Sequence, residues 1–591
     1  MLNFIKKYLS LLKQDFWLLA ILSMPGLLFF FIGLNQLEAA NWFTVIIGGL
    51  NKFAVEFLTI SILFCILHIL GIKKRWVFAV IMVLYYLTIA ADIVLLTYFK
   101  ERFDLKYLST LHGGQYQFMF DFRIIFGAIF VYLFAYITIR RNWHKPSLHT
   151  SAKKLAVSAV LLLLIAIISP FTYLNTNKAF LAATLMDTTV VDITKDLLAK
   201  KPRYKEYTGY KELPANLATA AAKYNLFKPS EFKNTKTYDK IILLTTEAFS
   251  NKFMNAFNPE IPLEASNVFD GLASAYPFAS IKNNTISTLY GLSVIFSGHP
   301  NAELMFKHGF PLSFVKILRD NGYKTAFFRG ANEEYMGEHI LFKQAGFESV
   351  YGAKYFAEQP GYSNYVSWWG LTDRKLFDYT LNYLKENKDK KLFIHLLTVD
   401  THVPFGRVDY LGQDYPEIND KYLPNKIKKL YKKPNMLRAF ARHNYDLGNF
   451  LKSLEDSGLL DAKTLVIITG DHPFYANVDT GAVFNNYKPV FDELPFMLVS
   501  GADIKQDWQA VSADIFKSQQ DIAPTILELA GLNTPQGMFG RSIFEATDRT
   551  VFYMKSNYVK ITNTHGTKLI PYSTKRPQDA AVVQLLNTVL K

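Results

Sequence analysis

Five long apolar segments lie in the first 174 residues, and they restrict the possible folds of this chain more than any other feature. They are Phe16–Asn35, Ala54–Ile72, Trp76–Phe99, Ile124–Ile139 and Leu155–Leu174. A helix needs about 20 mostly apolar residues to cross the hydrocarbon core of a bilayer. We therefore predict a transmembrane domain with five helices at residues 1–174. The first segment is too long for a cleavable signal peptide, and similar segments follow it.

Basic residues indicate how this domain is oriented. Lysine and arginine cluster before the first span, at Lys73–Arg75 after the second, and at Arg140–Lys154 between the fourth and fifth. Loops rich in these residues stay in the cytoplasm, so an odd number of spans leaves the rest of the chain outside. The net charge of +15 agrees with an anionic membrane surface as partner, and no motif indicates nucleic acid. Glu56, near the second span, either marks a frayed helix end or faces the bundle.

Residues 175–237 have the composition of a linker with interfacial helices. Met186–Lys200 and Ala215–Phe227 have helical patterns, while Lys201–Pro214 has the Pro, Gly, Lys and Tyr content of a loop on a membrane surface. The single cysteine, Cys65, excludes an intramolecular disulfide and a cysteine-based metal site.

Residues 238–591 are predicted to form an extracytoplasmic α/β domain. Short apolar runs alternate with helical stretches of ten or so residues, a pattern typical of a mostly parallel sheet with helices on both faces. The predicted strands are IILLTT, KTAFFRG, KLFIHLLTV, TLVIITG and LPFMLVSG, and the predicted helices include FVKILRDNG, LFDYTLNYLKEN, MLRAFARHNYDLGNFLKSLEDSG and DIAPTILELAG.

Two of these strands end in groups that bind metal ions. Glu247 follows the run Ile241–Leu244 and two threonines, and Asp471 with His472 follows Leu465–Ile468. Ligands of open α/β sheets bind beyond the carboxyl ends of the strands, so the three side chains are expected to converge. Two carboxylates and an imidazole without thiolates suit Mn²⁺, Mg²⁺ or Zn²⁺.

A hydroxyl group held against such a cation loses its proton more easily and can act as a nucleophile. The stretch NNTIST offers Thr285, Ser287 and Thr288 just before a predicted helix, STLYGLSVIF. We expect Thr285 to be the nucleophile, because the two preceding asparagines favour a tight turn that presents its hydroxyl. Backbone N–H groups at the start of that helix favour bound phosphate.

A further strand, KLFIHLLTV, ends in Asp400-Thr401-His402. His402 is expected to hold the substrate phosphate or to protonate a leaving alkoxide. His395, inside the strand, is expected to be a core histidine.

The ordered set TTEAF, NNTIST, DTHVPF, TGDH, LPFML and DIAPTILELAG, preceded by five spans, resembles the lipoteichoic acid synthase branch of the alkaline phosphatase/sulfatase superfamily. Phosphoethanolamine transferases share much of the same site. The resemblance implies that Glu247, Thr285, Asp471 and His472 bind one divalent metal, with Mn²⁺ expected first and Zn²⁺ or Mg²⁺ as alternatives. It also implies that Thr285 takes a phospho-alcohol group from a phospholipid and passes it to an acceptor hydroxyl, while His402 contacts substrate.

The same resemblance implies a multi-pass protein of a bacterial cytoplasmic (inner) membrane, with its catalytic domain on the outer side. The expected partners are a phospholipid donor, an envelope glycan or glycolipid acceptor, and the membrane, with no nucleic acid. The domain has no cysteine, which argues against sulfate-ester hydrolysis through a cysteine-derived nucleophile.

The chain also departs from this pattern. The acid, tryptophan and arginine that grip glycerol phosphate in lipoteichoic acid synthases correspond here to Ala331, Met336 and Glu338. Arg329 and Asn332 are expected to bind substrate in a different pocket. Two alternatives therefore stay open beside a phosphoglycerol-type transferase: a phosphoethanolamine transferase acting on lipid A or a glycan, and a catalytically inactive relative that senses lipid.

Overall fold

The computed structural model describes most of the second part of the chain and scattered positions of the first. The described residues are 20–24, 53, 56–57, 60–61, 66–67, 70, 77, 80–82, 85, 205–227, 236–259, 261–285, 287–334, 338–367, 370–402, 434–473, 493–502, 516–545, 549–554, 558–572 and 574–590. The chain divides into two compact units, Met1–Ala199 with Val478–Val490, and Lys200–Asn477 with Phe491–Lys591.

The predicted transmembrane spans lie almost entirely outside the described residues. Within the part that is described, no helix combines the length and the apolar character needed to cross a bilayer. Glu56 is buried in the first unit and accepts a hydrogen bond from the Tyr85 hydroxyl. Of the two interpretations of Glu56, this contact favours a side chain that faces the interior of its unit.

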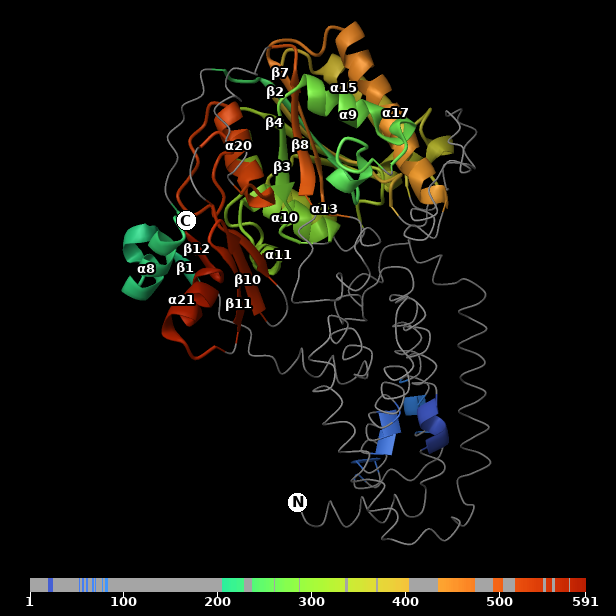
Figure 1. Ribbon diagram of the computed structural model, residues 1–591. Helices are drawn as coiled ribbons and strands as arrows, with labels where there is room; N and C mark the ends of the chain where they lie inside the picture. Colours follow the sequence, from blue (N-terminus) through green and yellow to red (C-terminus); the bar gives the residue numbers. More distant parts are fainter. Residues whose placement is uncertain are drawn as a thin grey trace. The chain divides into compact units, whose positions relative to one another are not determined.

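A seven-stranded sheet forms the centre of the second unit (Figure 1). Its strands, in spatial order, are β3 (Phe278–Lys282), β8 (Glu493–Ser500), β7 (Thr464–Gly470), β2 (Lys240–Thr246), β6 (Leu392–Leu397), β4 (Lys324–Arg329) and β5 (Ser349–Tyr351). The pairs from β7 to β5 are all parallel, and β8 runs antiparallel to both of its neighbours. The prediction of an α/β domain with a mostly parallel sheet is confirmed.

The alternation of side chains along β2 produces two hydrophobic cores. Ile242 and Leu244 face one core, and Ile241 and Leu243 face the other. Burying one such side chain contributes roughly 1.5–3 kcal/mol, so both faces need helical cover. Figure 1 shows α9, α15 and α17 on one side of the sheet and α20 on the other.

The first core receives side chains from α9 (Asn267–Ala275), α15 (Asp373–Glu386) and α17 (Pro434–Asp456). The second receives them from α10 (Thr288–Ser297), α11 (Ala302–His308), α12 (Phe314–Asp320), α13 (Glu338–Ala345) and α20 (Ile522–Leu529). The predicted helices are found in the two layers as α10, α12, α15, α17 and α20, while α9, α11 and α13 were not predicted. A short helix, α14 (Ala353–Ala357), follows β5.

The second half of the predicted linker is built into the domain. The helix predicted at Ala215–Phe227 is confirmed as α8 (Ala215–Lys223). Within the stretch interpreted as a surface loop, however, β1 (Lys205–Tyr207) pairs in parallel with the last strand, β12 (Thr588–Leu590). Leu213 and Phe227 are buried against apolar side chains from the C-terminal part of the chain, and this burial explains why the segment is ordered.

The C-terminal part that receives this segment contains a second, smaller sheet. It consists of β9 (Val551–Met554), β10 (Tyr558–Asn563) and β11 (Gly566–Pro571), all antiparallel, with α21 (Pro577–Leu585) beside it.

One helix glycine sets how closely α10 approaches the end of β7. A Cβ atom at Gly291 would lie 2.1 Å from the carbonyl oxygen of Asp471, far inside van der Waals contact. Glycine normally weakens a helix interior by about 0.5–1 kcal/mol relative to alanine, so its presence here has a packing reason.

We predict that Gly291→Ala destabilises the protein by about 1–3 kcal/mol, because the added methyl group pushes α10 away from β7. Gly271→Ala in α9 is the matched control, since a Cβ there meets nothing within 4 Å. The control should leave stability unchanged or raise it by about 0.5–1 kcal/mol. Thermal unfolding of the full chain, followed by circular dichroism, measures both. Equal midpoints for the two variants would contradict the packing argument.

Candidate metal centre and nucleophile

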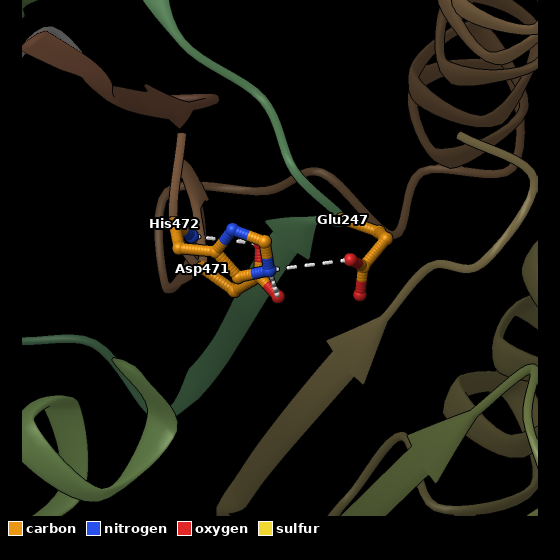
Figure 2. Close-up of side chains that lie close together, drawn as sticks. All are labelled: Glu247, Asp471 and His472. Carbon is orange, nitrogen blue, oxygen red and sulfur yellow. Dashed lines mark hydrogen bonds and ion pairs between the residues drawn. The ribbon is translucent and has the colours of Figure 1, made fainter. Parts of the chain in front are cut away.

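Glu247, Asp471 and His472 meet at the carboxyl end of the sheet, as predicted from the strand ends. Glu247 follows β2 and the other two follow β7, which pairs with β2 in register up to Thr246 and Gly470. One ligand atom from each side chain lies within 4.8 Å of the other two, and all three residues are buried. Figure 2 shows the His472 ring turned toward the Glu247 carboxylate. In the described part of the chain, no other group of three His, Cys, Asp or Glu side chains comes this close.

Asp471 is held through only one of its carboxylate oxygens. Its Oδ1 accepts the backbone N–H groups of Ala248 and His472, each at 2.8 Å. Its Oδ2 is buried and has no hydrogen-bond partner among the described residues. The Ala248 backbone takes the left-handed conformation, with φ of 54°, and this unusual geometry turns its N–H toward Asp471.

The His472 ring is oriented for metal binding. Its Nδ1 lies 2.9 Å from the Pro473 carbonyl oxygen, which can only accept, so Nδ1 carries the proton. Its Nε2 lies 3.4 Å from Glu247 Oε1 and 3.6 Å from Asp471 Oδ2. A ring nitrogen fixed by a carbonyl on its far side is the usual arrangement of a metal-binding histidine.

The charges in this cluster perturb one another strongly. Burial raises the pKa of Asp471, and the neighbouring Glu247 carboxylate raises it further, to about 7. Burial also acts to raise the pKa of Glu247, but His402 and His472 outweigh this effect and lower it to about 2. Burial lowers the pKa of His472, but the Asp471 and Glu247 carboxylates more than offset this and raise it to about 9. Without a cation, the cluster therefore retains protons at neutral pH.

These residues suit a divalent cation. Two buried carboxylates are costly to keep charged unless a positive group compensates them, and one of them has an oxygen without a hydrogen-bond partner among the described residues. Two carboxylate oxygens and an imidazole nitrogen are typical ligands of Mn²⁺, Zn²⁺ or Mg²⁺.

The hydroxyl beside this cluster belongs to Thr288, and this differs from our expectation. Thr288 Oγ1 lies 3.1 Å from His472 Nε2 and 3.3 Å from Glu247 Oε2. Thr285 lies three residues earlier, before the N-cap Ser287, and its carbonyl oxygen accepts a hydrogen bond from Asn283 Nδ2. The predicted turn exists, but it is the first residue of α10 that reaches the cluster. Thr288 is partly exposed, as a nucleophile must be.

His402 lies close enough to Glu247 to influence its charge, in agreement with the predicted convergence of the strand ends. The segment that precedes His402 forms hydrogen bonds with both the backbone N–H and the backbone carbonyl oxygen of Glu247. Thr398 Oγ1 accepts the Glu247 N–H at 3.1 Å, and the Thr401 hydroxyl donates to the Glu247 carbonyl oxygen at 2.6 Å.

His395 is fully buried among phenylalanine rings, as expected of a core histidine.

Comparison with known families agrees with this geometry. Residues 239–532 match the family described as Sulfatase. The chain carries a sulfatase-family domain. The matched residues include Glu247, Thr288, His402, Asp471 and His472, and the match agrees with the resemblance carried by the sequence motifs.

Named relatives of the sulfatase-family domain are phosphotransferases. Phosphoglycerol transferase I of Citrobacter koseri is 24% identical over 277 residues, which cover 44% of this chain. The same protein from Salmonella choleraesuis is 23% identical over 285 residues. In both cases the match spans only 34% of the relative, about a third of its length.

Among solved structures, the integral membrane protein lipooligosaccharide phosphoethanolamine transferase A of Neisseria meningitidis shares the fold. Its TM-score is 0.59 at 15% identity, and the alignment covers 90% of this chain and 98% of that one.

Two residues predicted to bind substrate are engaged in contacts within the sulfatase-family domain. Arg329, at the end of β4, forms a buried ion pair with Glu338. Asn332 Oδ1 accepts the N–H of Glu334 at 2.8 Å, which closes a local turn. A substrate role for these two residues stays a prediction.

Gln519 is a site-supporting residue that the sequence did not indicate. Its side-chain amide donates to the Asp471 carbonyl oxygen at 2.5 Å, and its Oε1 accepts the Asn284 N–H at 2.9 Å. It therefore joins the loop that carries Asp471 and His472 to the segment that leads into α10. In the sequence, Gln519 is recognisable only as a residue that precedes the predicted helix DIAPTILELAG, and this position does not predict its contacts with Asp471 and Asn284.

We predict that the full chain binds a divalent cation with an affinity that rises with pH and levels off above about pH 9. His472 must lose its proton to bind metal, and its pKa of about 9 means that this proton is still present at neutral pH. Each proton released steepens the rise, up to about tenfold per pH unit. Isothermal titration calorimetry with Mn²⁺ in buffers of different ionisation enthalpy measures both the affinity and the protons released. An affinity that does not change between about pH 6 and 9 would contradict this assignment of ligands.

Proposed function

We propose that this protein is a metal-dependent membrane phosphotransferase. In this proposal it moves a phospho-alcohol head group, of the phosphoglycerol type, from a phospholipid to an envelope glycan or lipid through a phosphothreonine intermediate. The observation that carries the proposal is the Thr288 hydroxyl at 3.1 Å from His472 Nε2, beside two buried carboxylates. The phosphoglycerol transferase relatives support the chemical class.

Glu247, Asp471 and His472 would hold the cation, with Mn²⁺ as our first expectation and Zn²⁺ or Mg²⁺ as alternatives. When bound, such a cation lowers the pKa of a hydroxyl held against it and neutralises charge on a transferring phosphoryl group. Thr288 replaces Thr285 as our proposed nucleophile, because its side chain lies within hydrogen-bond distance of the ligands.

The reaction is two displacements at phosphorus. In the first, Thr288 Oγ1 bonds to phosphorus, its proton leaves to water, and the bond from phosphorus to the diacylglycerol oxygen breaks. His402 gives a proton to that oxygen, so diacylglycerol leaves as a neutral alcohol. In the second, the acceptor hydroxyl oxygen bonds to phosphorus and the bond to Thr288 breaks. Thr288 regains its proton from water, and the acceptor hydroxyl gives its proton to His402.

The start of α10 supports this role for Thr288. The first N–H groups of a helix have no partner within the helix, and they favour bound phosphate oxygens. The Ser287 side chain does not cap them. A phosphate attacked by Thr288 would therefore lie where these N–H groups are available.

The membrane context follows from the sequence. The five apolar segments and the basic loops between them favour a multi-pass protein of the cytoplasmic (inner) membrane, with the sulfatase-family domain outside. Both the phospholipid donor and the envelope acceptor would be available there.

A phosphoethanolamine transferase acting on lipid A or a glycan is the second candidate. The observation that favours it is the fold shared with the lipooligosaccharide phosphoethanolamine transferase, which extends over most of both chains. An inactive lipid-sensing relative is less well supported, because both carboxylates, the imidazole and the adjacent hydroxyl are all retained.

We predict that Thr288→Ala lowers headgroup release by at least about a thousandfold, because the nucleophile is lost. Thr285→Ala and Ser287→Ala remove neighbouring hydroxyls of the same segment and should each cost less than about tenfold. Thermal midpoints of all three variants should stay close to that of the parent protein. If Thr288→Ala retains activity while Thr285→Ala loses it, the nucleophile is Thr285 as the sequence first indicated.

The head group is identified by a direct comparison of donors. Vesicles containing phosphatidylglycerol or phosphatidylethanolamine, each with a labelled head group, are incubated with the full chain and Mn²⁺. We expect diacylglycerol release from phosphatidylglycerol, and none with Asp471→Ala. Release from phosphatidylethanolamine alone would establish the second candidate. Release from neither lipid, by a protein that binds metal, would contradict both.

A further inference from the structure

Another buried histidine lies behind the residues proposed to bind the metal. His443, on α17, places its Nε2 3.0 Å from Thr246 Oγ1 and its Nδ1 2.9 Å from Asp373 Oδ2. The side chains of His443 and Asp373 are fully buried, and Thr246 is fully buried as well. Because the carboxylate accepts from Nδ1–H, Nε2 is left to accept the hydroxyl proton of Thr246. Thr246 immediately precedes the metal ligand Glu247.

Asp373 extends this chain of hydrogen bonds to the segment that carries His402. Its Oδ1 accepts the Val399 N–H at 2.7 Å, and its own N–H donates to Asp400 Oδ2 at 3.0 Å. The Thr246–His443–Asp373 relay therefore connects the end of β2, through α17 and α15, to the residues that follow β6. Two residues of the segment that follows β6, Thr398 and Thr401, also form hydrogen bonds with the backbone of Glu247.

The relay has the hydrogen-bond order of a hydrolase triad, in which a hydroxyl, an imidazole and a carboxylate follow one another. Its three side chains have no access to solvent, so no substrate can reach the Thr246 hydroxyl. A catalytic role is therefore excluded. The relay can instead hold in place the residues at its two ends: the end of β2 before Glu247, and Val399 and Asp400 before His402.

The geometry points to His443 and Asp373 as positioning residues that hold the Glu247 carboxylate and the segment of His402 in one arrangement around the cation and the substrate phosphate. This inference rests on the proposed function, since it assigns a purpose to residues behind the same site. Outer partners of metal-binding groups typically contribute about 10–100-fold to metal affinity or activity.

The neighbouring residue on β2 supplies a matched control. Thr245 Oγ1 lies 2.8 Å from the Nε2 of His395, which is also a fully buried hydroxyl–imidazole pair. This pair lies among phenylalanine rings, and His395 Nδ1 has no hydrogen-bond partner among the described residues. The Thr245–His395 pair therefore matches the Thr246–His443 pair in chemistry and burial. Among the described residues, however, His395 has no carboxylate partner equivalent to Asp373.

The test compares Thr246→Val with Thr245→Val in the full chain. Each variant removes one buried hydroxyl at nearly constant volume. Mn²⁺ affinity is measured by calorimetry, headgroup release by kcat and KM, and stability by the thermal midpoint without metal. We expect Thr246→Val to weaken Mn²⁺ binding by about 10–100-fold and to lower kcat with little change in KM. Thr245→Val should lower the midpoint by a similar amount or more, yet keep the Mn²⁺ affinity within about threefold.

Thr246→Ser, which keeps the hydroxyl, should restore Mn²⁺ affinity and kcat. Equal effects of the two valine variants on Mn²⁺ affinity would overturn the inference, as would a failure of serine to rescue. A parent chain that binds no Mn²⁺ would also overturn it, because there would be no ligand to position. A failure of the proposed function gives another result. The parent chain then binds Mn²⁺ and the variants show the expected changes in Mn²⁺ affinity, but neither the parent chain nor any variant releases a lipid head group.

Discussion

The architecture of the described domain depends on bringing two carboxylates and an imidazole together in a buried place. Glu247, Asp471 and His472 all have less than a tenth of their surface exposed, and Asp471 Oδ2 has no hydrogen-bond partner in the part of the chain that the structure describes. The two carboxylates repel each other unless protons or a cation neutralise them, and the raised pKa of Asp471 reflects burial and this repulsion. The raised pKa of His472 reflects its attraction to both carboxylates. A divalent cation would neutralise the two carboxylates, and in the proposed function it would activate the nearby Thr288 hydroxyl.

Parallel strands make this convergence possible for residues more than two hundred positions apart. β2 and β7 end side by side, so their next residues share one edge of the sheet. Around them the chain adds specific restraints: Gly291 allows α10 to approach Asp471, Gln519 joins the two loops, and the relay through His443 ties β2 to the segment after β6. The site is therefore held by contacts among at least five elements rather than by one rigid loop.

The sequence predicted the features that depend on local pattern. Apolar runs identified β2, β4, β6, β7 and β8, and the residues following two of these strands identified Glu247, Asp471 and His472. The sequence could not decide between Thr285, Ser287 and Thr288, because the position at which α10 begins determines which hydroxyl lies beside the cluster. The choice of Thr285 stays untested, and the observed contacts are those of Thr288. Gln519, His443 and Asp373 were missed because their roles arise from tertiary contacts that no local pattern encodes. The predicted transmembrane spans fall almost entirely outside the described residues and stay a prediction.

The most direct test of the account is anomalous diffraction at the manganese edge from crystals of the full chain grown with Mn²⁺. We predict one anomalous peak within about 2.0–2.4 Å of ligand atoms from Glu247, Asp471 and His472, with Thr288 Oγ1 completing the set. The absence of a peak at this cluster, or a peak bound by the Thr285 hydroxyl with Thr288 turned away, would contradict it.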